Sequence, residues 1–364
     1  MAITKMHDVL DFGVKEGASD WHIREGSTVA LRVGGKLIEI DFMTDADYLK
    51  EFMDDIATDK IRKEYEEDGD SNFALVEDDV GRFRVNLHRQ RGFLSMTLRH
   101  VKDEVPDVDA LGLPKTILGL SESKNGIIFV TGATGSGKST TLACMIEHMN
   151  RNTNRHLVTI EDPIEYNFKD KNCIIEQREV GLDTISFDSA MRNALRQDPD
   201  VIMVGELRNR DSFESALAAS ETGHLVMTTL HTSNAAQSIN RILDFYPKDE
   251  REGVRKGLAE NLRAIICQRL IPKASGKGVL PINEILINTP IVTKLLFENK
   301  LDKLEGAIRG GKEEGMITFN NALLDLVNEG MITEETALSF ASNKESLKMN
   351  LQGIFLNEDG GILG

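Results

Sequence analysis

The first hundred residues consist of short segments in which apolar and polar positions alternate. Such alternation, with β-branched and aromatic residues, predicts half-buried strands. Helical spacing of apolar positions occurs near 5–16 and 47–64. The chain is therefore expected to begin with an α+β module whose strands lie at 29–33, 36–40, 72–76, 81–86 and 94–100.

The pattern changes after about residue 115, where the apolar segments become continuous. These segments lie at 127–130, 157–160, 201–204 and 225–229, and each is followed by a helix-like stretch of about ten residues or more. Alternation of buried strands with helices predicts an α/β fold with a mainly parallel sheet. From about 290 the pattern becomes helical, with Gly310 and Gly311 separating two segments, and the tail at 357–364 is expected to be frayed.

A domain boundary is expected where Pro106 and Pro114 bracket an acidic stretch, because proline disfavours helix in the residue before it. We therefore divide the chain into an N-terminal domain at 1–104, a linker at 105–116 and a second domain at 117–364. The second domain includes the helical region at about 290–350.

Composition supports two globular domains and excludes several functions. The 364 residues are 40% hydrophobic, and 43 Lys and Arg against 59 Asp and Glu give a net charge of −16, which disfavours general nucleic-acid binding. No apolar run is long enough for a membrane span, and the N-terminus has acids where a signal peptide needs apolar residues. The protein is therefore expected in the cytosol, with its three well-separated cysteines reduced and without a zinc site.

The strongest chemical signal is GATGSGKS at 132–139, which matches the phosphate-binding loop pattern G-x-x-x-x-G-K-[ST]. It lies between a predicted strand and a helix expected to start near Lys138. Backbone N–H groups of such a loop surround phosphates, the lysine reaches the β and γ oxygens, and the Ser139 hydroxyl ligates Mg²⁺. The predicted ligands are ATP and Mg²⁺, and the predicted binding residues are Gly132, Ala133, Thr134, Gly135, Ser136, Gly137, Lys138, Ser139 and Thr140.

Acidic residues follow two of the predicted strands. Glu161, Asp162 and Glu165 come at the carboxyl end of one strand, where parallel sheets bind ligands, and one of them is a candidate to polarise the attacking water. An ordinary acidic loop is the alternative. The segment DPDVIMVGELR resembles a Walker B strand in which Gly205 replaces the usual Asp, so Glu206 is predicted to meet Mg²⁺ through water.

Histidine and arginine supply further candidates. His231 follows a predicted strand and is a candidate γ-phosphate sensor, whereas His224 precedes it and is expected to be structural. Arg192 and Arg196 share a helical face and are candidates to bind phosphate or Asp and Glu partners, with a solvated basic face as the alternative. In the first domain Arg84 and Arg99 stand out from a cluster of arginines; on neighbouring strands they would act as arginine fingers on an adjacent subunit's nucleotide, with pairing to acids of the same chain as the alternative.

The segments GATGSGKST, TIEDPIEY, QREVGLDT, RQDPDVIMVGELR and TGHLVMTTLHT together resemble the secretion ATPases of type II secretion and type IV pili. The resemblance extends over about residues 5–345 and includes GASDWHIREG near the N-terminus. It implies a PAS-like N-terminal domain joined to a RecA-like ATPase domain, assembled as a homo-hexamer.

Within this family the chain is more similar to the pilus retraction group, PilT and PilU, than to assembly ATPases, which have long N-terminal extensions and a four-cysteine zinc loop. One departure is IVTKLLFENK from Ile291, where PilT proteins have AIRNLIRE. The resemblance implies Glu165 as general base with Glu161 and Asp162 beside it.

The implied function is an ATP-hydrolysing motor for pilus retraction in twitching motility. The implied location is the cytoplasmic side of the inner membrane at the pilus base, with a platform protein and a second retraction ATPase as partners. An accessory subunit that depends on another motor, and an assembly or type II secretion motor, are the alternatives.

Overall fold

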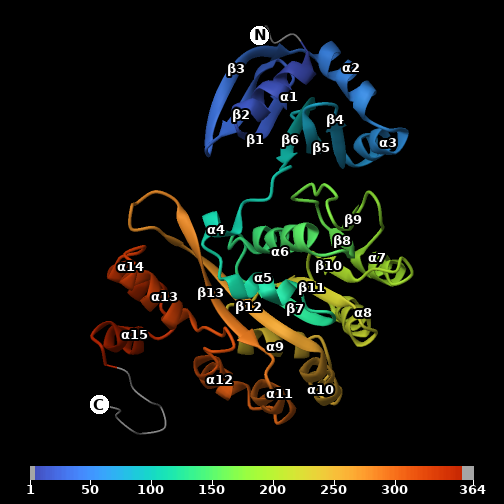
Figure 1. Ribbon diagram of the computed structural model, residues 1–364. Helices are drawn as coiled ribbons and strands as arrows, with labels where there is room; N and C mark the ends of the chain where they lie inside the picture. The colour runs from blue at the N-terminus through green and yellow to red at the C-terminus, as the bar shows by residue number, and fades with distance from the viewer. Residues whose placement is uncertain (1–4, 355–364) are drawn as a thin grey trace. The chain divides into compact units, whose positions relative to one another are not determined.

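The computed structural model describes residues 5–354 and contains two separate β-sheets, one in each of two units (Figure 1). One unit comprises the described residues up to Glu104 together with Pro163–Phe168. The other comprises Val105–Asp162 and the described residues from Lys169 onward. The short segment Pro163–Phe168 thus groups with the first unit although it lies inside the second in sequence. The predicted tail at 357–364 lies outside the described residues.

The first unit is a six-stranded antiparallel sheet with three helices. Its strand order is β3-β2-β1-β6-β5-β4. The strands are β1 (Ala18–Arg24), β2 (Ser27–Val33), β3 (Lys36–Thr44), β4 (Asp70–Glu77), β5 (Gly81–Gln90) and β6 (Phe93–Val101), and the helices are α1 (Met6–Lys15), α2 (Ala46–Ile56) and α3 (Asp59–Asp68).

The core of this unit explains why its first helix and first strand pack together. Trp21 is fully buried, packs edge-to-face on Phe83 with ring centroids 5.2 Å apart, and donates from Nε1 to the Val9 carbonyl oxygen of α1 at 3.1 Å. The helical stretch expected near 47–64 is present as two helices. The first ends before Ala57, and Thr58 caps the second by accepting from the Ile61 amide.

The second unit is built on a seven-stranded sheet in the order β13-β12-β7-β11-β10-β8-β9. All neighbours from β12 to β9 are parallel, and β13 pairs antiparallel at the edge. This confirms the predicted α/β class with a mainly parallel sheet. The strands are β7 (Gly126–Thr131), β8 (His156–Glu161), β9 (Ile174–Glu179), β10 (Val201–Val204), β11 (Leu225–Leu230), β12 (Leu262–Pro272) and β13 (Val279–Ile287).

Helices pack on this sheet and continue beyond it. Between and beside the strands lie α4 (Val108–Leu111), α5 (Lys115–Ser121), α6 (Lys138–Asn152), α7 (Phe187–Ala194), α8 (Arg210–Glu221), α9 (Ala235–Leu243) and α10 (Arg251–Asn261). The predicted helical region follows as α11 (Pro290–Phe297), a 3₁₀ turn (Leu301–Lys303), α12 (Leu304–Gly310), α13 (Phe319–Asn328), α14 (Glu334–Phe340) and α15 (Lys344–Leu351). Gly311 follows α12 directly, so the predicted break is present. Figure 1 shows α13, α14 and α15 grouped beyond β13.

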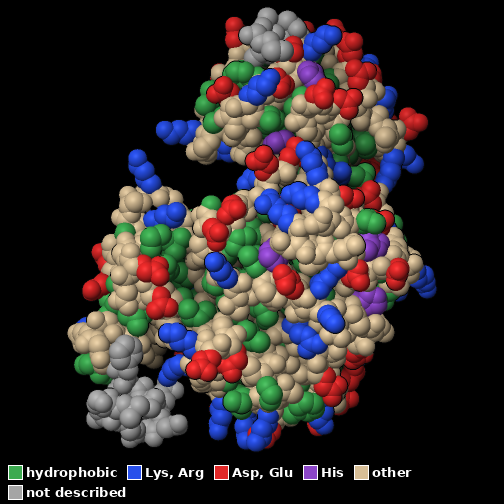
Figure 2. Space-filling model, viewed as in Figure 1, with side chains coloured by type: hydrophobic (Ala, Val, Ile, Leu, Met, Phe, Trp, Pro, Cys, Tyr) green, Lys and Arg blue, Asp and Glu red, His purple; other side chains and the backbone are tan. Residues whose placement is uncertain are grey.

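Acidic and basic side chains are interspersed over the visible face of each unit (Figure 2). Among residues 5–354, no helix has the length and apolar content that a membrane span requires.

Candidate functional site

The loop between β7 and α6 has the backbone shape that phosphate binding requires. Gly132, Gly135 and Gly137 have φ of 152°, 77° and 86°, values that residues with a Cβ rarely adopt. A Cβ on Gly132 would lie 2.4 Å from the Gln268 carbonyl oxygen and 2.5 Å from Ser136 Oγ. Glycine at this position therefore lets the loop fold tightly against β12.

Lys138 is buried at the first position of α6, with its ammonium turned back onto the loop. Nζ donates to the carbonyl oxygens of Gly132 at 2.9 Å and Ala133 at 3.1 Å. Ser136 Oγ is also buried and has no hydrogen-bond partner. A buried cation, an unsatisfied hydroxyl and a helix N-terminus in one loop fit the phosphate groups of a nucleotide. Ala133 and Thr134 complete the loop, and Ser139 and Thr140 lie in the first turn of α6.

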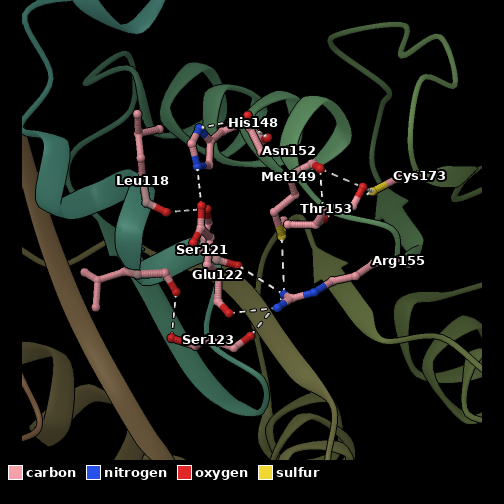
Figure 3. A network of polar contacts seen from close by, with 11 residues as sticks. Leu118, Ser121, Glu122, Ser123, His148, Met149, Asn152, Thr153, Arg155 and Cys173 are labelled. Atoms are coloured by element: carbon pink, nitrogen blue, oxygen red, sulfur yellow. Dashed lines mark hydrogen bonds and ion pairs between the residues drawn. The ribbon is translucent and has the colours of Figure 1, made fainter.

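The other end of α6 is fixed by a network of polar contacts (Figure 3). Arg155, which follows the helix, donates to the carbonyl oxygens of Glu122 at 2.7 Å and Ser123 at 3.1 Å, where α5 ends. His148 Nε2 lies 2.7 Å from Glu122 Oε1. These contacts hold α6 against α5. They therefore fix the position of the helix whose N-terminus lies at the phosphate-binding loop.

Glu161 is the last residue of β8, at the edge of the sheet where ligands of parallel sheets bind. It is buried, and its Oε1 accepts from Thr159 Oγ1 at 2.7 Å and Gln177 Nε2 at 3.2 Å. Asp162 follows and is exposed. The two side chains therefore have different environments although they are adjacent in sequence.

Glu165 belongs to the segment Pro163–Phe168, which groups with the first unit. The Asn167 amide donates to the Lys102 carbonyl oxygen at 2.9 Å, and Asn167 Nδ2 donates to Asp103 Oδ1 at 3.0 Å. The carboxylates predicted as one group are thus divided between the two units, with Glu161 and Asp162 in the second. No sequence signal marks this division.

Glu206 lies in the loop after β10, and its side chain contacts the loop after the neighbouring strand β11. Its Oε1 lies 3.2 Å from His231 Nε2, and its Oε2 accepts from Arg208 Nε at 2.9 Å. The hydrogen bond to Glu206 raises the pKa of Arg208. His224 lies at the opposite end of β11, with Nδ1 2.9 Å from the Ala219 carbonyl oxygen. This contact fits the structural role expected for His224.

Arg84 and Arg99 are directly opposite each other on β5 and β6. Arg99 Nε donates to Asp20 Oδ1 at 2.8 Å, and Ser19 Oγ donates to Asp20 Oδ2 at 2.7 Å. Burial alone would raise the pKa of Asp20, but the hydrogen bonds from Ser19 and Arg99 outweigh it, and the pKa is lowered. The Arg99 side chain is still 67% exposed, so it can contact a further anion.

Other charged candidates have few contacts. Within residues 5–354, Arg84 has no ion pair. Arg192 and Arg196 are exposed at the end of α7, and Arg196 Nη1 donates to the Arg192 carbonyl oxygen at 3.3 Å. No group of three or more His, Cys, Asp and Glu side chains in the described part of the chain is arranged to hold a metal ion.

Gln268, which is buried beneath the phosphate-binding loop, was not among the residues predicted from the sequence. Its strand, β12, was not among the predicted strands, and glutamine belongs to no sequence pattern for nucleotide binding. Only the pairing of β12 with β7 brings this side chain to the loop.

Comparison with known proteins agrees with this geometry. The model of a family described as "Type II/IV secretion system protein" matches residues 4–291. Two proteins of Pseudomonas aeruginosa are similar along 93% of this chain: the type IV pilus ATPase PilU, 39% identical over 89% of its length, and the type IV pilus retraction ATPase PilT, 40% identical over 98%. A crystal structure of the pilus retraction motor PilT with bound ADP has a TM-score of 0.87 and 42% identity, covering 95% of this chain and 99% of that one.

Proposed function

The chain belongs to the type II/IV secretion system protein family, and from this premise we propose that it is an ATPase that powers retraction of type IV pili. The observation that carries the proposal is the loop from Gly132 to Ser139, with its buried ammonium and its glycine-dependent contact with β12. The similarity to a retraction motor with bound ADP supports both the nucleotide and the mechanical role.

The loop residues hold the triphosphate. Backbone N–H groups of the loop and the N-terminus of α6 surround the phosphates, and the Lys138 ammonium moves from the loop carbonyls to the β and γ oxygens. Ser139 is proposed as a ligand of Mg²⁺, with Glu206 contacting the ion through water. A bound Mg²⁺ neutralises charge on the phosphate oxygens.

Hydrolysis is proposed to occur by in-line attack of water on the γ-phosphorus. The new P–O bond forms as the bond to the bridging oxygen of ADP breaks, and the water proton passes to a carboxylate and then to solvent. Glu165 is the proposed base, with Glu161 as the alternative. His231, paired with Glu206, is placed after β11 and is proposed to sense the γ-phosphate.

The arginines of the first unit are proposed to act on the nucleotide of a neighbouring subunit in a homo-hexamer. Arg84 and Arg99 lie side by side on a sheet that has no phosphate-binding loop of its own. Positive charge beside the γ-phosphate stabilises the transition state. Coupling hydrolysis to movement between the two units would then perform mechanical work.

The proposed place of work is the cytoplasmic side of the inner membrane, at the pilus base, with a platform protein as partner. A second retraction ATPase is proposed as a further partner, because the chain is about equally similar to PilU and PilT.

Complementation tests the motor function directly. The chain is expressed in a piliated bacterium that lacks its own PilT and PilU, and twitching and surface pili are measured. We expect wild type to restore twitching and Lys138→Ala to leave the cells hyperpiliated and non-motile, since the loop ammonium is lost. Restoration only when PilT is also present would assign the accessory role instead, and no effect in either background would contradict a role in retraction.

A further inference from the structure

Gln268 lies beneath the phosphate-binding loop on β12, the strand that pairs with β7. The neighbouring residue Cys267 is opposite Thr131, the last residue before the loop. Gln268 is only 2% exposed, so each polar atom of its side chain requires a partner within the protein.

The side-chain amide of Gln268 has three hydrogen bonds that fix its orientation. Oε1 accepts from Thr141 Oγ1 at 2.7 Å and from Asn283 Nδ2 at 3.0 Å. Nε2 donates to the Ser136 carbonyl oxygen at 2.8 Å. Because the Ser136 carbonyl oxygen can only accept, the end of the amide that faces the loop is the NH₂ group, and the oxygen faces Thr141 and Asn283.

The contact with Ser136 determines the direction of the next N–H group. In a trans peptide the C=O and the following N–H point in opposite directions. Holding the Ser136 carbonyl against β12 therefore turns the Gly137 N–H away from the sheet and into the phosphate-binding concavity. A Cβ on Gly137 would lie 2.9 Å from Gln268 Nε2, so glycine is needed at this position for the contact.

We propose that Gln268 is a positioning residue for nucleotide binding, which orients the Ser136–Gly137 peptide so that its N–H meets the phosphates. This inference rests on the proposed function of the loop. Gln268 itself does not contact nucleotide. Loop N–H groups of this kind bind phosphates that ATP and ADP share, so Gln268 is expected to affect the affinity for both nucleotides by a similar factor.

Gln268→Glu tests the role, because it keeps the shape and the acceptor for Thr141 and Asn283 but replaces the donor that faces Ser136. We expect the Kd for Mg²⁺·ADP and the KM for ATP each to rise about tenfold or more, with a smaller change in kcat. Gln268→Met, of similar length and uncharged, is measured beside it because a buried carboxylate can prevent folding.

Asn288→Asp is the matched control. Asn288 Nδ2 also donates to backbone carbonyl oxygens, those of Ala259 at 2.8 Å and Leu262 at 3.0 Å, but at the end of β13 and not at the loop. We expect this variant to lower the unfolding midpoint and to leave the Kd for Mg²⁺·ADP unchanged.

The outcomes separate this inference from the proposed function. Wild type that fails to bind Mg²⁺·ADP contradicts the proposed function. Wild type that binds, together with a folded Gln268 variant of equal affinity, overturns the positioning role alone. An equal loss of affinity in Asn288→Asp also overturns it, since the loss then reflects general destabilisation.

Discussion

Glu161 and Glu165 show how residues close in sequence acquire different chemistry. Glu161 is buried, and its Oε1 already accepts two hydrogen bonds. Glu165 is exposed on a segment that groups with the first unit. A base must be able to approach the attacking water, and the more accessible carboxylate fits this requirement better.

The assignment of the base predicts different behaviour for two isosteric variants. Glu165→Gln is expected to bind Mg²⁺·ATP with wild-type affinity and to lower kcat by about 10² or more, the usual effect of losing a positioned base. Single-turnover hydrolysis and equilibrium binding measure the two quantities separately. Normal turnover in Glu165→Gln with loss of turnover in Glu161→Gln would transfer the role to Glu161.

Individual elements differ in how well the sequence predicts them. The strands β7, β10 and β11 are buried along their whole length and therefore appear as mainly apolar runs. The edge strand β9 has the sequence IIEQRE and lacks that pattern, whereas in β12 the short apolar run AIIC is followed by the polar Gln268 and Arg269.

The residues of the candidate site also differ in how well the sequence predicts them. The phosphate-binding loop is local in sequence and could be predicted, as could the strand ends that carry Glu161 and His231. The contact of Gln268 with Ser136 joins residues 132 positions apart, and no local pattern records it. Likewise, the grouping of Glu165 with the first unit depends on contacts with Lys102 and Asp103.

The contacts between α5 and α6 give a prediction about stability. Arg155→Ala removes donors to consecutive carbonyl oxygens at the end of α5 and is expected to lower the free energy of unfolding by about 1–3 kcal/mol. Arg151→Ala is the control, because the Arg151 side chain is exposed and its i, i+4 pair with Glu147 is expected to contribute about 0.5 kcal/mol or less. Denaturant unfolding compares the two variants. Equal losses of unfolding free energy would contradict the inference that Arg155 stabilises the packing of α5 against α6.

Glu284 on β13 gives a pH-dependent prediction at the N-terminus of α9. It accepts from the Ala235 amide at 2.9 Å. Burial raises the pKa of this carboxyl, and Glu305 adds to the effect, while the Ala235 amide and Arg269 oppose it. A raised folded-state pKa means that folding favours the protonated form, so stability is lost as the pH rises above the unfolded-state value.

Glu284→Gln keeps an acceptor for the Ala235 amide and cannot ionise. We expect its unfolding midpoint to equal that of wild type near pH 4 and to exceed it increasingly as the pH rises toward 7. Thermal unfolding at several pH values measures the difference. A midpoint below that of wild type at pH 7 would show that the ionised carboxylate stabilises the fold.

At the scale of the whole molecule, the proposed chemistry is divided between the two units. The phosphate-binding loop lies in the second unit. Arg84 and Arg99, which are opposite each other on β5 and β6, lie in the first. A single chain is therefore proposed to hold nucleotide in one unit and to present arginines from the other to a neighbouring subunit. From this division we predict that activity requires a ring of subunits.

Mixing two inactive variants tests this claim most directly. Lys138→Ala subunits keep their arginines, whereas Arg84→Ala/Arg99→Ala subunits keep their phosphate-binding loop. Each parent is expected to be nearly inactive, the arginine variant by about 10³ or more with nucleotide binding preserved. Mixed rings should recover Mg²⁺-dependent ATPase activity, since an intact loop then meets intact arginines. Mixtures no more active than either parent, or a fully active monomer, would contradict the cross-subunit mechanism.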